Sequence, residues 1–437
     1  MGHQALNELG LTPYLLKMKE SLEKSGIKPF NVLMFLGLIF MIAYRKWADS
    51  VSSPKLEGCF GESSKAYMKT RTKRVQKLRR ENASKFPNIT PLENFEWEKT
   101  EPLKFRPFKP KYHLTMALEN LEPSELIPMD NTYKDRIELR RQLVKDQYGV
   151  VLGVNKSKGG EEEPRVRAAV AELYAFVMGT YLPTRYPTMF RLLEADLAMG
   201  KTMFVQNQVT REMLPTTLNP GRPTISALET LAKNVDEEML LLLPRVKNPE
   251  KKSQDITTSS TNEVDKYILE AYSTCFPSGF DTRTKLGRQL NEIHQPVPGY
   301  KEKLEKSMDR FFHKLEVGKF VKRVNWTMTT GAELFSAFGD VHAVNGEDMK
   351  QMNLEELDID KTYLRCERQT LYRLPTSGAL IFSFHTYRYP IREIKAEGSG
   401  EELALAIDGF KEGSTPLMAR YKRVTAWGEA VKEYLRS

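Results

Sequence analysis

The stretch Cys275–Tyr300 reads CFPSGFDTRTKLGRQLNEIHQPVPGY and carries the clearest structural signals in this chain. The apolar and aromatic run Tyr267–Phe276 leads into it and is typical of a strand. Within Lys285–His294, three apolar side chains recur at helical spacing, so we predict a helix there. Pro296 follows at once and ends that helix, because proline restricts the residue before it and has no amide hydrogen to donate.

His294 stands at the end of the predicted helix and has two interpretations. A basic residue at a helix C-terminus often bonds the last free carbonyls, with help from the helix dipole. Alternatively, an imidazole held on a proline-locked helix end over apolar surface suits a metal ligand. The residues by themselves leave both interpretations open.

Composition excludes some function classes. The 437 residues are long enough for one large or two ordinary domains, and 40% apolar content is enough for a sizeable core. Three cysteines argue against a disulfide framework and against a four-thiolate zinc or iron–sulfur site within the chain. The net charge of +9 is concentrated early, with eleven Lys or Arg against three Asp or Glu between Arg45 and Arg80. No nucleic-acid-binding module accompanies it, so we expect no nucleic-acid partner.

The N-terminal part predicts a membrane anchor. Residues 29–47 contain an uncharged apolar run that is followed by Arg45, Lys46 and Trp47, an interfacial anchor pattern. A buried helix is the alternative, because the run is slightly short for a bilayer. The basic flank predicts a single-pass protein with its main domain in the cytosol. Residues 1–28 are predicted to be an amphipathic segment and residues 48–104 a basic tether.

The remaining residues, 105–437, predict an α+β domain. Strands are expected near 112–118, 266–276, 319–328, 362–374 and 378–389, with connections that allow antiparallel pairing. The last strand is rich in aromatic residues and is expected to close a hairpin through Pro375–Gly378. Helical periodicity is expected over 134–147, 165–182, 187–199, 302–315, 401–407 and 420–435. Residues 246–262 are polar and low in complexity, so we predict a flexible insertion.

Two segments carry unusual charge patterns. The acidic triplet Asp236–Glu238 directly precedes an apolar run, and a solvated acidic turn is its ordinary interpretation. The strand predicted over Thr362–Leu374 places Arg365, Glu367 and Gln369 on one face. Its opposite face is polar as well, which favours a strand with one face lining a charged pocket over a simple half-buried strand.

Three motifs together resemble the haem-dependent oxidative N-demethylase family. They are F-P-S-G-F followed by K-L-G-x-x-L-x-x-I-H-x-P-V-P-G within 276–299, R-x-N-W within 319–330, and R-x-E-R-Q-T-L-x-R-L-P at 365–375. The resemblance covers most of 105–421 and implies a PAS-like antiparallel sheet with helical elaborations that binds haem b through an axial histidine. It also implies that O2 and a small methylated amine react there, and that the methyl group leaves as formaldehyde.

The resemblance also implies roles for particular residues. His294 would be the iron ligand, with His113 as the alternative. Glu237 or Glu238 would point into the pocket and hold the alkylammonium substrate. The remaining cofactor contacts would come from Lys285, Arg368 and Arg373, the two arginines as propionate clamps. For these arginines, an arginine–glutamate network with Glu367 that stabilises the sheet is an equally open interpretation.

The electrons for such a reaction need a source. The chain contains neither a G-x-G-x-x-G dinucleotide fingerprint nor a cysteine set for an iron–sulfur cluster, so we expect a separate flavin and iron–sulfur reductase partner. Two other functions stay open at this point: a non-catalytic haem-binding sensor or carrier, and a membrane-tethered scaffold without cofactor.

Overall fold

The computed structural model describes residues 86–437, apart from positions 107, 158, 198–199, 246–265, 332, 340 and 344–346. The predicted amphipathic segment 1–28, anchor 29–47, most of the tether 48–104 and the insertion 246–262 therefore lie outside the described residues. Among the residues that are described, no helix combines the length and the apolar character needed to cross a bilayer.

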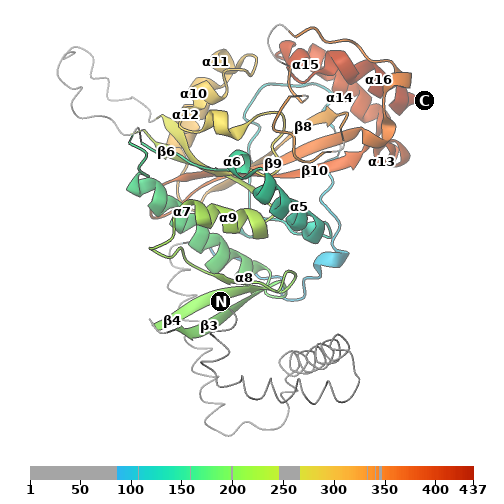
Figure 1. The fold of residues 1–437 in the computed structure, drawn as a ribbon. Coiled ribbons are helices and arrows are strands. Elements are labelled where there is room, and N and C mark those ends of the chain that lie inside the picture. Colours follow the sequence, from blue (N-terminus) through green and yellow to red (C-terminus); the bar gives the residue numbers. More distant parts are fainter. Residues whose placement is uncertain are drawn as a thin grey trace, which may run out of the picture. The chain divides into compact units, whose positions relative to one another are not determined.

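A seven-stranded sheet forms the centre of the described part (Figure 1). Every neighbouring pair in it is antiparallel. This confirms the α+β class and the antiparallel sheet, while the PAS-like assignment stays a prediction. In spatial order the strands are β1 (Glu119–Asn120), β8 (Phe320–Thr329), β9 (Tyr363–Arg373), β10 (Leu380–Pro390), β6 (Glu238–Pro244), β7 (Tyr267–Ser273) and β2 (Leu152–Val154).

Strands β9 and β10 form the longest pairing in the sheet, with Arg373 opposite Leu380 at the turn. The turn is stabilised from outside, because the Glu172 carboxylate accepts the backbone N–H groups of Thr376 and Ser377 at 2.7 Å each. Gly378 has φ of +69°, a left-handed conformation that glycine adopts without strain. The hairpin predicted from the aromatic-rich strand and the turn residues Pro375–Gly378 is thus confirmed.

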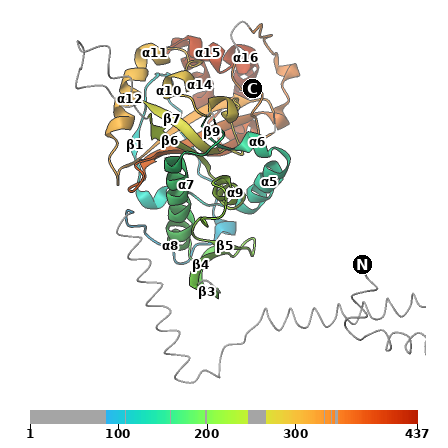
Figure 2. The same ribbon diagram turned by 60° about the vertical axis from the view of Figure 1, so that its left-hand side comes forward.

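Helices cover both faces of the sheet (Figures 1 and 2). One face carries α5 (Tyr133–Asp146), α7 (Pro164–Phe176) and α9 (Ile225–Asn234); the other carries α10 (Leu290–Ile293), α11 (Tyr300–Lys303), α12 (Glu305–Lys314), α14 (Gly400–Glu412) and α16 (Val424–Arg436). Each face has its own hydrophobic core. In α7 the predicted apolar stripe of Val166, Val170 and Leu173 is fully buried.

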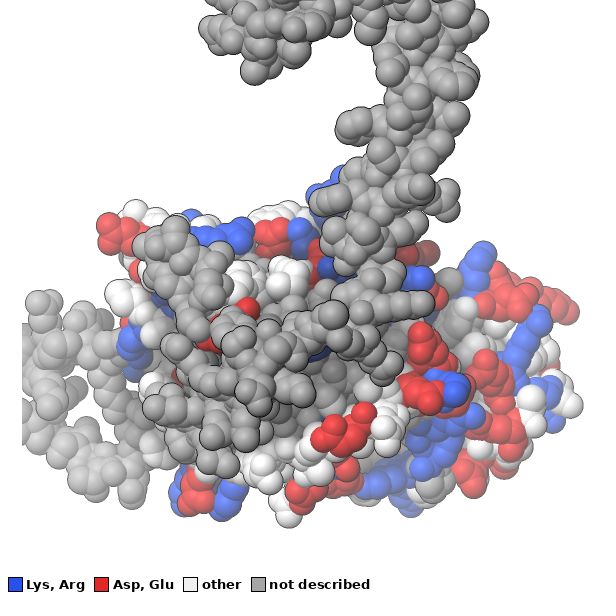
Figure 3. All heavy atoms as spheres, turned by 90° about the horizontal axis from the view of Figure 1, so that it is seen from below, with Lys and Arg blue, Asp and Glu red and all other residues white. Residues whose placement is uncertain are grey.

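Shorter elements complete the described part. The helices are α6 (Tyr148–Val151), a π-helical turn at Val177–Tyr181, α8 (Leu182–Arg185), α13 (Ile391–Ala396) and α15 (Leu417–Tyr421). Single 3₁₀ turns lie at Trp97–Lys99, Pro123–Glu125, Thr282–Lys285, Leu354–Glu356 and Ile359–Lys361. Acidic and basic side chains are interspersed over the described part of the face in Figure 3, as on an ordinary solvated surface.

The helix predicted over 187–199 is wrong. Most of this segment is strand β3 (Phe190–Leu197), which pairs with β4 (Gly200–Asn207) and, through it, with β5 (Met213–Pro215) in a separate small sheet. Its apolar residues fit a helical and a strand period alike, and eight cross-strand pairs with β4 decide between them.

The strand predicted over 112–118 is also wrong, because only Glu119–Asn120 joins the sheet. The preceding residues form an extended strap that bonds to the end of α14: Tyr112 donates its N–H to the Gly409 carbonyl and accepts from the N–H of Ser414. A Cβ on Gly409 would lie 2.0 Å from the Pro110 carbonyl oxygen, so glycine allows this close approach. The strap forms one wall of the cavity described below.

The helix predicted over 285–294 is much shorter than expected, a single turn at Leu290–Ile293. Gly287 has φ of +76°, which interrupts a helix, and its N–H donates to the Leu269 carbonyl of β7. Gln289 and Glu292 then form a capping box that starts the turn. This anchoring to β7 positions the following residue, His294, beside the sheet.

Candidate functional site

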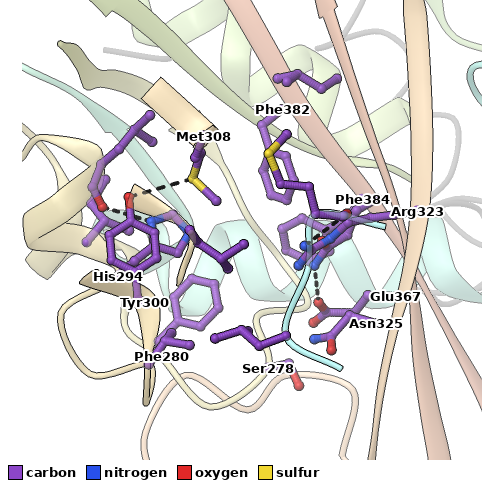
Figure 4. A pocket seen from close by; sticks show the side chains of 18 of the residues that line it. Ser278, Phe280, His294, Tyr300, Met308, Arg323, Asn325, Glu367, Phe382 and Phe384 are labelled. Atoms are coloured by element: carbon purple, nitrogen blue, oxygen red, sulfur yellow. Dashed lines mark hydrogen bonds between the residues drawn. The ribbon is translucent and has the colours of Figure 1, made fainter. Parts of the chain in front are cut away.

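A cavity of about 250 Å³ lies between the sheet and the helices that follow residue 289 (Figure 4). Its floor comes from five strands, its sides from α10 to α12 and from α15, and its edge from the strap at 112–118. Most of the lining is apolar; the apolar residues on the floor are Leu240, Leu242, Leu269, Val321, Leu371, Phe382 and Phe384. Such an apolar pocket with a few polar groups is typical of a small-molecule or cofactor site.

His294 occupies one side of this cavity (Figure 4). Its ring Nδ1 lies 2.8 Å from the Leu290 carbonyl oxygen, and its ring stacks on Tyr300 with centroids 4.9 Å apart. A carbonyl accepts only from an N–H, so Nδ1 carries the proton and Nε2 keeps its lone pair. Burial lowers the pKa of this imidazole to about 4, which keeps it neutral at pH 7.

The other side of the cavity is a polar patch on neighbouring strands, seen in Figure 4 at Arg323, Asn325 and Glu367. Arg323 and Asn325 are two residues apart on β8, and each lies opposite a residue of β9: Gln369 and Glu367 respectively. Arg323 Nε donates to Gln369 Oε1 at 2.7 Å, and Gln369 Nε2 donates to Glu367 Oε2 at 2.9 Å. Glu367 Oε1 is buried and has no hydrogen-bond partner among the described residues.

Lys422 reaches this patch from the turn between α15 and α16. It is 3% exposed, and its Nζ donates to Asn325 Oδ1 at 2.9 Å and to the Trp326 carbonyl. These acceptors are neutral, so they do not compensate the ammonium charge. Burial lowers the pKa of Lys422 to about 7, because a charged amine is disfavoured away from water.

Two further titratable groups line the same region. Arg365 is 1% exposed and donates to the carbonyls of Leu334, Phe276 and Pro277, and burial lowers its pKa to about 10. His342 stacks on Tyr421 with ring centroids 4.4 Å apart, and burial lowers its pKa to about 3. The predicted face with Arg365, Glu367 and Gln369 therefore does line a charged pocket.

The residues predicted to contact the cofactor do not all line the cavity. Lys285 lines the cavity and is half-buried, and burial lowers its pKa. His113 is exposed and lies outside the lining. Arg373 donates to the carbonyls of Leu315 and Phe312 and to other groups near α12, so it holds that helix in place.

Arg368 lies on the opposite face of β9 from Glu367 and Gln369, because successive strand residues alternate. Its guanidinium donates to the backbone carbonyls of Leu126 and Glu125. No hydrogen bond joins either Arg368 or Arg373 to Glu367 among the described residues. The described residues therefore show no hydrogen-bonded network between these arginines and Glu367. Both arginines donate mainly to backbone carbonyls instead.

The acidic triplet is buried, which corrects the solvated turn expected from the sequence. Asp236, Glu237 and Glu238 are at most 3% exposed, and none lines the cavity. Arg136 and Arg140 of α5 bind Asp236 and Glu238. Burial raises the pKa of Asp236, but the Arg136 guanidinium outweighs it and the pKa is lowered overall.

Glu237 differs from its neighbours, because neither of its carboxylate oxygens has a hydrogen-bond partner among the described residues. The nearest titratable group is His385, whose Nδ1 lies 3.5 Å from Glu237 Oε2 and 2.7 Å from the Asp236 carbonyl oxygen. Burial raises the pKa of the Glu237 carboxyl. The structure thus places the predicted substrate carboxylates away from the cavity, where Glu367 lies instead.

The sequence prediction overlooked Arg323, Asn325, His342 and Lys422 as cavity residues. A signal existed for the first two, because the R-x-N-W motif lies on an alternating strand and puts both on one face. His342 follows an irregular loop and Lys422 follows a five-residue helix, so no periodicity predicts where their side chains point.

One comparison with known proteins bears on this site. The family model described as haem-dependent oxidative N-demethylase, alpha subunit-like, matches residues 117–432. The match covers more than half of the chain and includes His294, the polar patch on β8 and β9, and Lys422. The strap at 112–118 lies almost entirely before the matched range.

Proposed function

The chain belongs to the haem-dependent oxidative N-demethylase alpha subunit-like family, and on this premise we propose that it is a haem-dependent oxidoreductase that removes a methyl group from a small amine. The observation that supports this most directly is His294, a neutral imidazole on the wall of an apolar cavity with its Nδ1 proton held by a carbonyl. Metal-binding histidines commonly use this second hydrogen bond to orient the ring.

The cavity residues fit a haem. Nε2 of His294 would bind the iron, since Leu290 holds the ring and Tyr300 stacks against it. Apolar side chains around it suit a porphyrin plane, and Lys285 offers a cation to a propionate. When bound, haem b supplies the activation of O2 through which the methyl group is oxidised and lost as formaldehyde.

Glu367 is our candidate for the group that holds the amine. Its Oε1 is buried without a partner and faces the cavity, so an alkylammonium N–H would satisfy it. A carboxylate so placed orients the substrate and accepts a proton from it. Gln369 fixes the carboxylate by donating to its second oxygen. This assignment replaces Glu237 and Glu238, which lie away from the cavity.

The electron source and the location of the protein are further parts of the proposal. We propose that a separate flavin and iron–sulfur reductase delivers electrons, and that residues 29–47 anchor the chain in a membrane with the catalytic part in the cytosol. Sustained turnover with NADPH in the absence of any other protein would contradict the first point. Recovery of the full-length chain in the soluble fraction of gently lysed cells would contradict the second.

The haem proposal is tested by the absorption spectrum of the full-length protein. We expect a Soret band that His294→Ala abolishes, because the replaced imidazole is the iron ligand. His113→Ala is the matched control and keeps the band, since that side chain is exposed outside the cavity. Addition of dimethylamine is expected to shift the spectrum. A Soret band without any amine response would favour the haem-binding sensor over the enzyme, and no band in the wild-type protein would refute both.

A further inference from the structure

The polar end of the cavity holds three cations and a single carboxylate, Glu367. Arg323, Arg365 and Lys422 all line it, and every hydrogen bond they make among the described residues goes to an amide or backbone oxygen. Glu367 is the one carboxylate among the described lining residues, and no ion pair joins it to any of the three. Glu367 acts on all three cations from a distance, but one carboxylate cannot balance three buried cations, so an anionic group on a ligand would be favoured here.

The same end of the cavity also contains an unsatisfied acceptor, which a cation or another hydrogen-bond donor on a ligand would satisfy. Glu367 is 7% exposed and its Oε1 has no hydrogen-bond partner within the described part of the chain. Because Glu367 lies opposite Asn325 in the β8–β9 register, its carboxylate is a direct neighbour of the group that Lys422 binds. Arg323 lies two residues from Asn325 on β8, so both side chains are on the same face of that strand. Glu367, Arg323 and Lys422 therefore all adjoin Asn325, and we call these four residues the polar patch.

We propose that this patch binds a zwitterionic N-methylated amino acid, whose carboxylate lies between Arg323 and Lys422 and whose ammonium binds Glu367. The inference rests on the proposed N-demethylation and narrows its substrate from small amines in general to amines that carry a carboxylate. A zwitterion satisfies both requirements of the patch at once. A porphyrin propionate would meet the two cations but would leave Glu367 Oε1 without a donor.

Spectral titration of the haem-loaded full-length protein tests this inference. N,N-dimethylglycine and dimethylamine are the two probes, because they differ by a carboxymethyl group on the nitrogen. We expect N,N-dimethylglycine to bind at least about tenfold more tightly, the factor typical of one charge-assisted contact. N,N-dimethylglycine ethyl ester, in which the carboxylate is blocked, should lose this advantage.

Three variants identify the residues responsible for the preference for N,N-dimethylglycine. In Lys422→Met the ratio of the two dissociation constants should fall towards one, and Lys422→Arg, which keeps the charge, should largely retain the ratio. In Glu367→Gln both probes should bind more weakly, because both use their ammonium. Equal affinity of the wild-type protein for the two probes, with a normal Soret band, would overturn the inference and leave the proposed function standing.

A different result would reassign the patch to the cofactor. If Lys422→Met lost the Soret band while Lys422→Arg kept it, the cations would be shown to hold the porphyrin propionates and the inference would be overturned. If Lys422→Met failed to fold, the comparison of acid, amine and ester on the wild-type protein would still decide the matter. Absence of a Soret band from the wild-type protein would be a failure of the proposed function itself.

Discussion

Buried charges lie on both faces of the seven-stranded sheet, and they are arranged differently on the two faces. On the face covered by α5, Asp236 and Glu238 are bound by Arg136 and Arg140, in direct ion pairs. On the cavity face, Glu367 and its neighbouring cations bond only neutral groups within the described residues. Both clusters come from similar residue types with similar burial.

The difference separates a structural cluster from a candidate binding site. Charges paired inside the protein are satisfied by the fold and need nothing from outside. Cavity charges that make no direct ion pair, and in which cations outnumber carboxylates, gain most when a ligand arrives, and such groups are typical of functional sites. Strongly charged residues are therefore poor guides to function until their partners are known.

The largest effect is expected from Arg140→Met, on the paired face. Arg140 is fully buried and holds both Glu238 and the carbonyls of Ala232 and Glu237. Its loss leaves buried carboxylates uncompensated, so the free energy of unfolding should fall by about 3–5 kcal/mol. Denaturant unfolding of the full chain measures this. A loss below about 1 kcal/mol would mean that the two clusters do not differ as described.

The second prediction concerns Glu237, the member of the acidic triplet that has no arginine partner among the described residues and lies 3.5 Å from His385 instead. Its folded pKa is raised above the ordinary 4.5, so ionisation at neutral pH costs stability. Glu237→Gln should raise the free energy of unfolding at pH 7 by about 1–3 kcal/mol. The gain should shrink as the pH falls towards 4.5 and vanish below it, because the wild-type carboxyl is then protonated in both states. A gain that is constant from pH 7 to pH 4 would contradict this account.

The third prediction uses the titration of Lys422 on the cavity face. Its pKa is lowered to about 7, so the ammonium loses its proton as the pH rises through that value. Affinity for N,N-dimethylglycine should fall by up to about tenfold for each pH unit above 7, until the higher pKa of the bound state is reached. In Lys422→Arg the affinity should stay flat between pH 7 and 9. A flat profile in the wild-type protein would remove Lys422 from the site.

The smallest effect is expected from Arg141→Met, which is adjacent to Arg140 on the same helix. Arg141 pairs with Glu212 and donates to the Lys233 carbonyl and to Asn234 Oδ1, but the Arg141 and Glu212 side chains are about a third or more exposed. Water screens such a pair, so its loss should cost about 0.2–1 kcal/mol. The same unfolding experiment provides the comparison. If the Arg141 and Arg140 variants lost equal stability, burial would not be what distinguishes these ion pairs.

Local patterns predicted much of the sheet and little of the site. Alternation along β9 correctly placed Glu367 and Gln369 on one face, because a strand directs successive side chains to opposite sides. The same rule placed Arg368 on the other face, yet the family resemblance alone suggested it as a clamp. Resemblance also suggested Glu237 and Glu238, although position next to an apolar strand says nothing about which face of the sheet the cavity occupies.

The sequence by itself determined the α+β class, the β9–β10 hairpin, the family, and His294 as a candidate at the end of a helical turn. These follow from local periodicity, from proline and glycine, and from contiguous motifs. Only the tertiary structure decided that Lys422 binds Asn325 and lines the same cavity as Glu367, and that the acidic triplet meets α5. The reason is that a charge's partner is set by packing between distant segments, which no local pattern records.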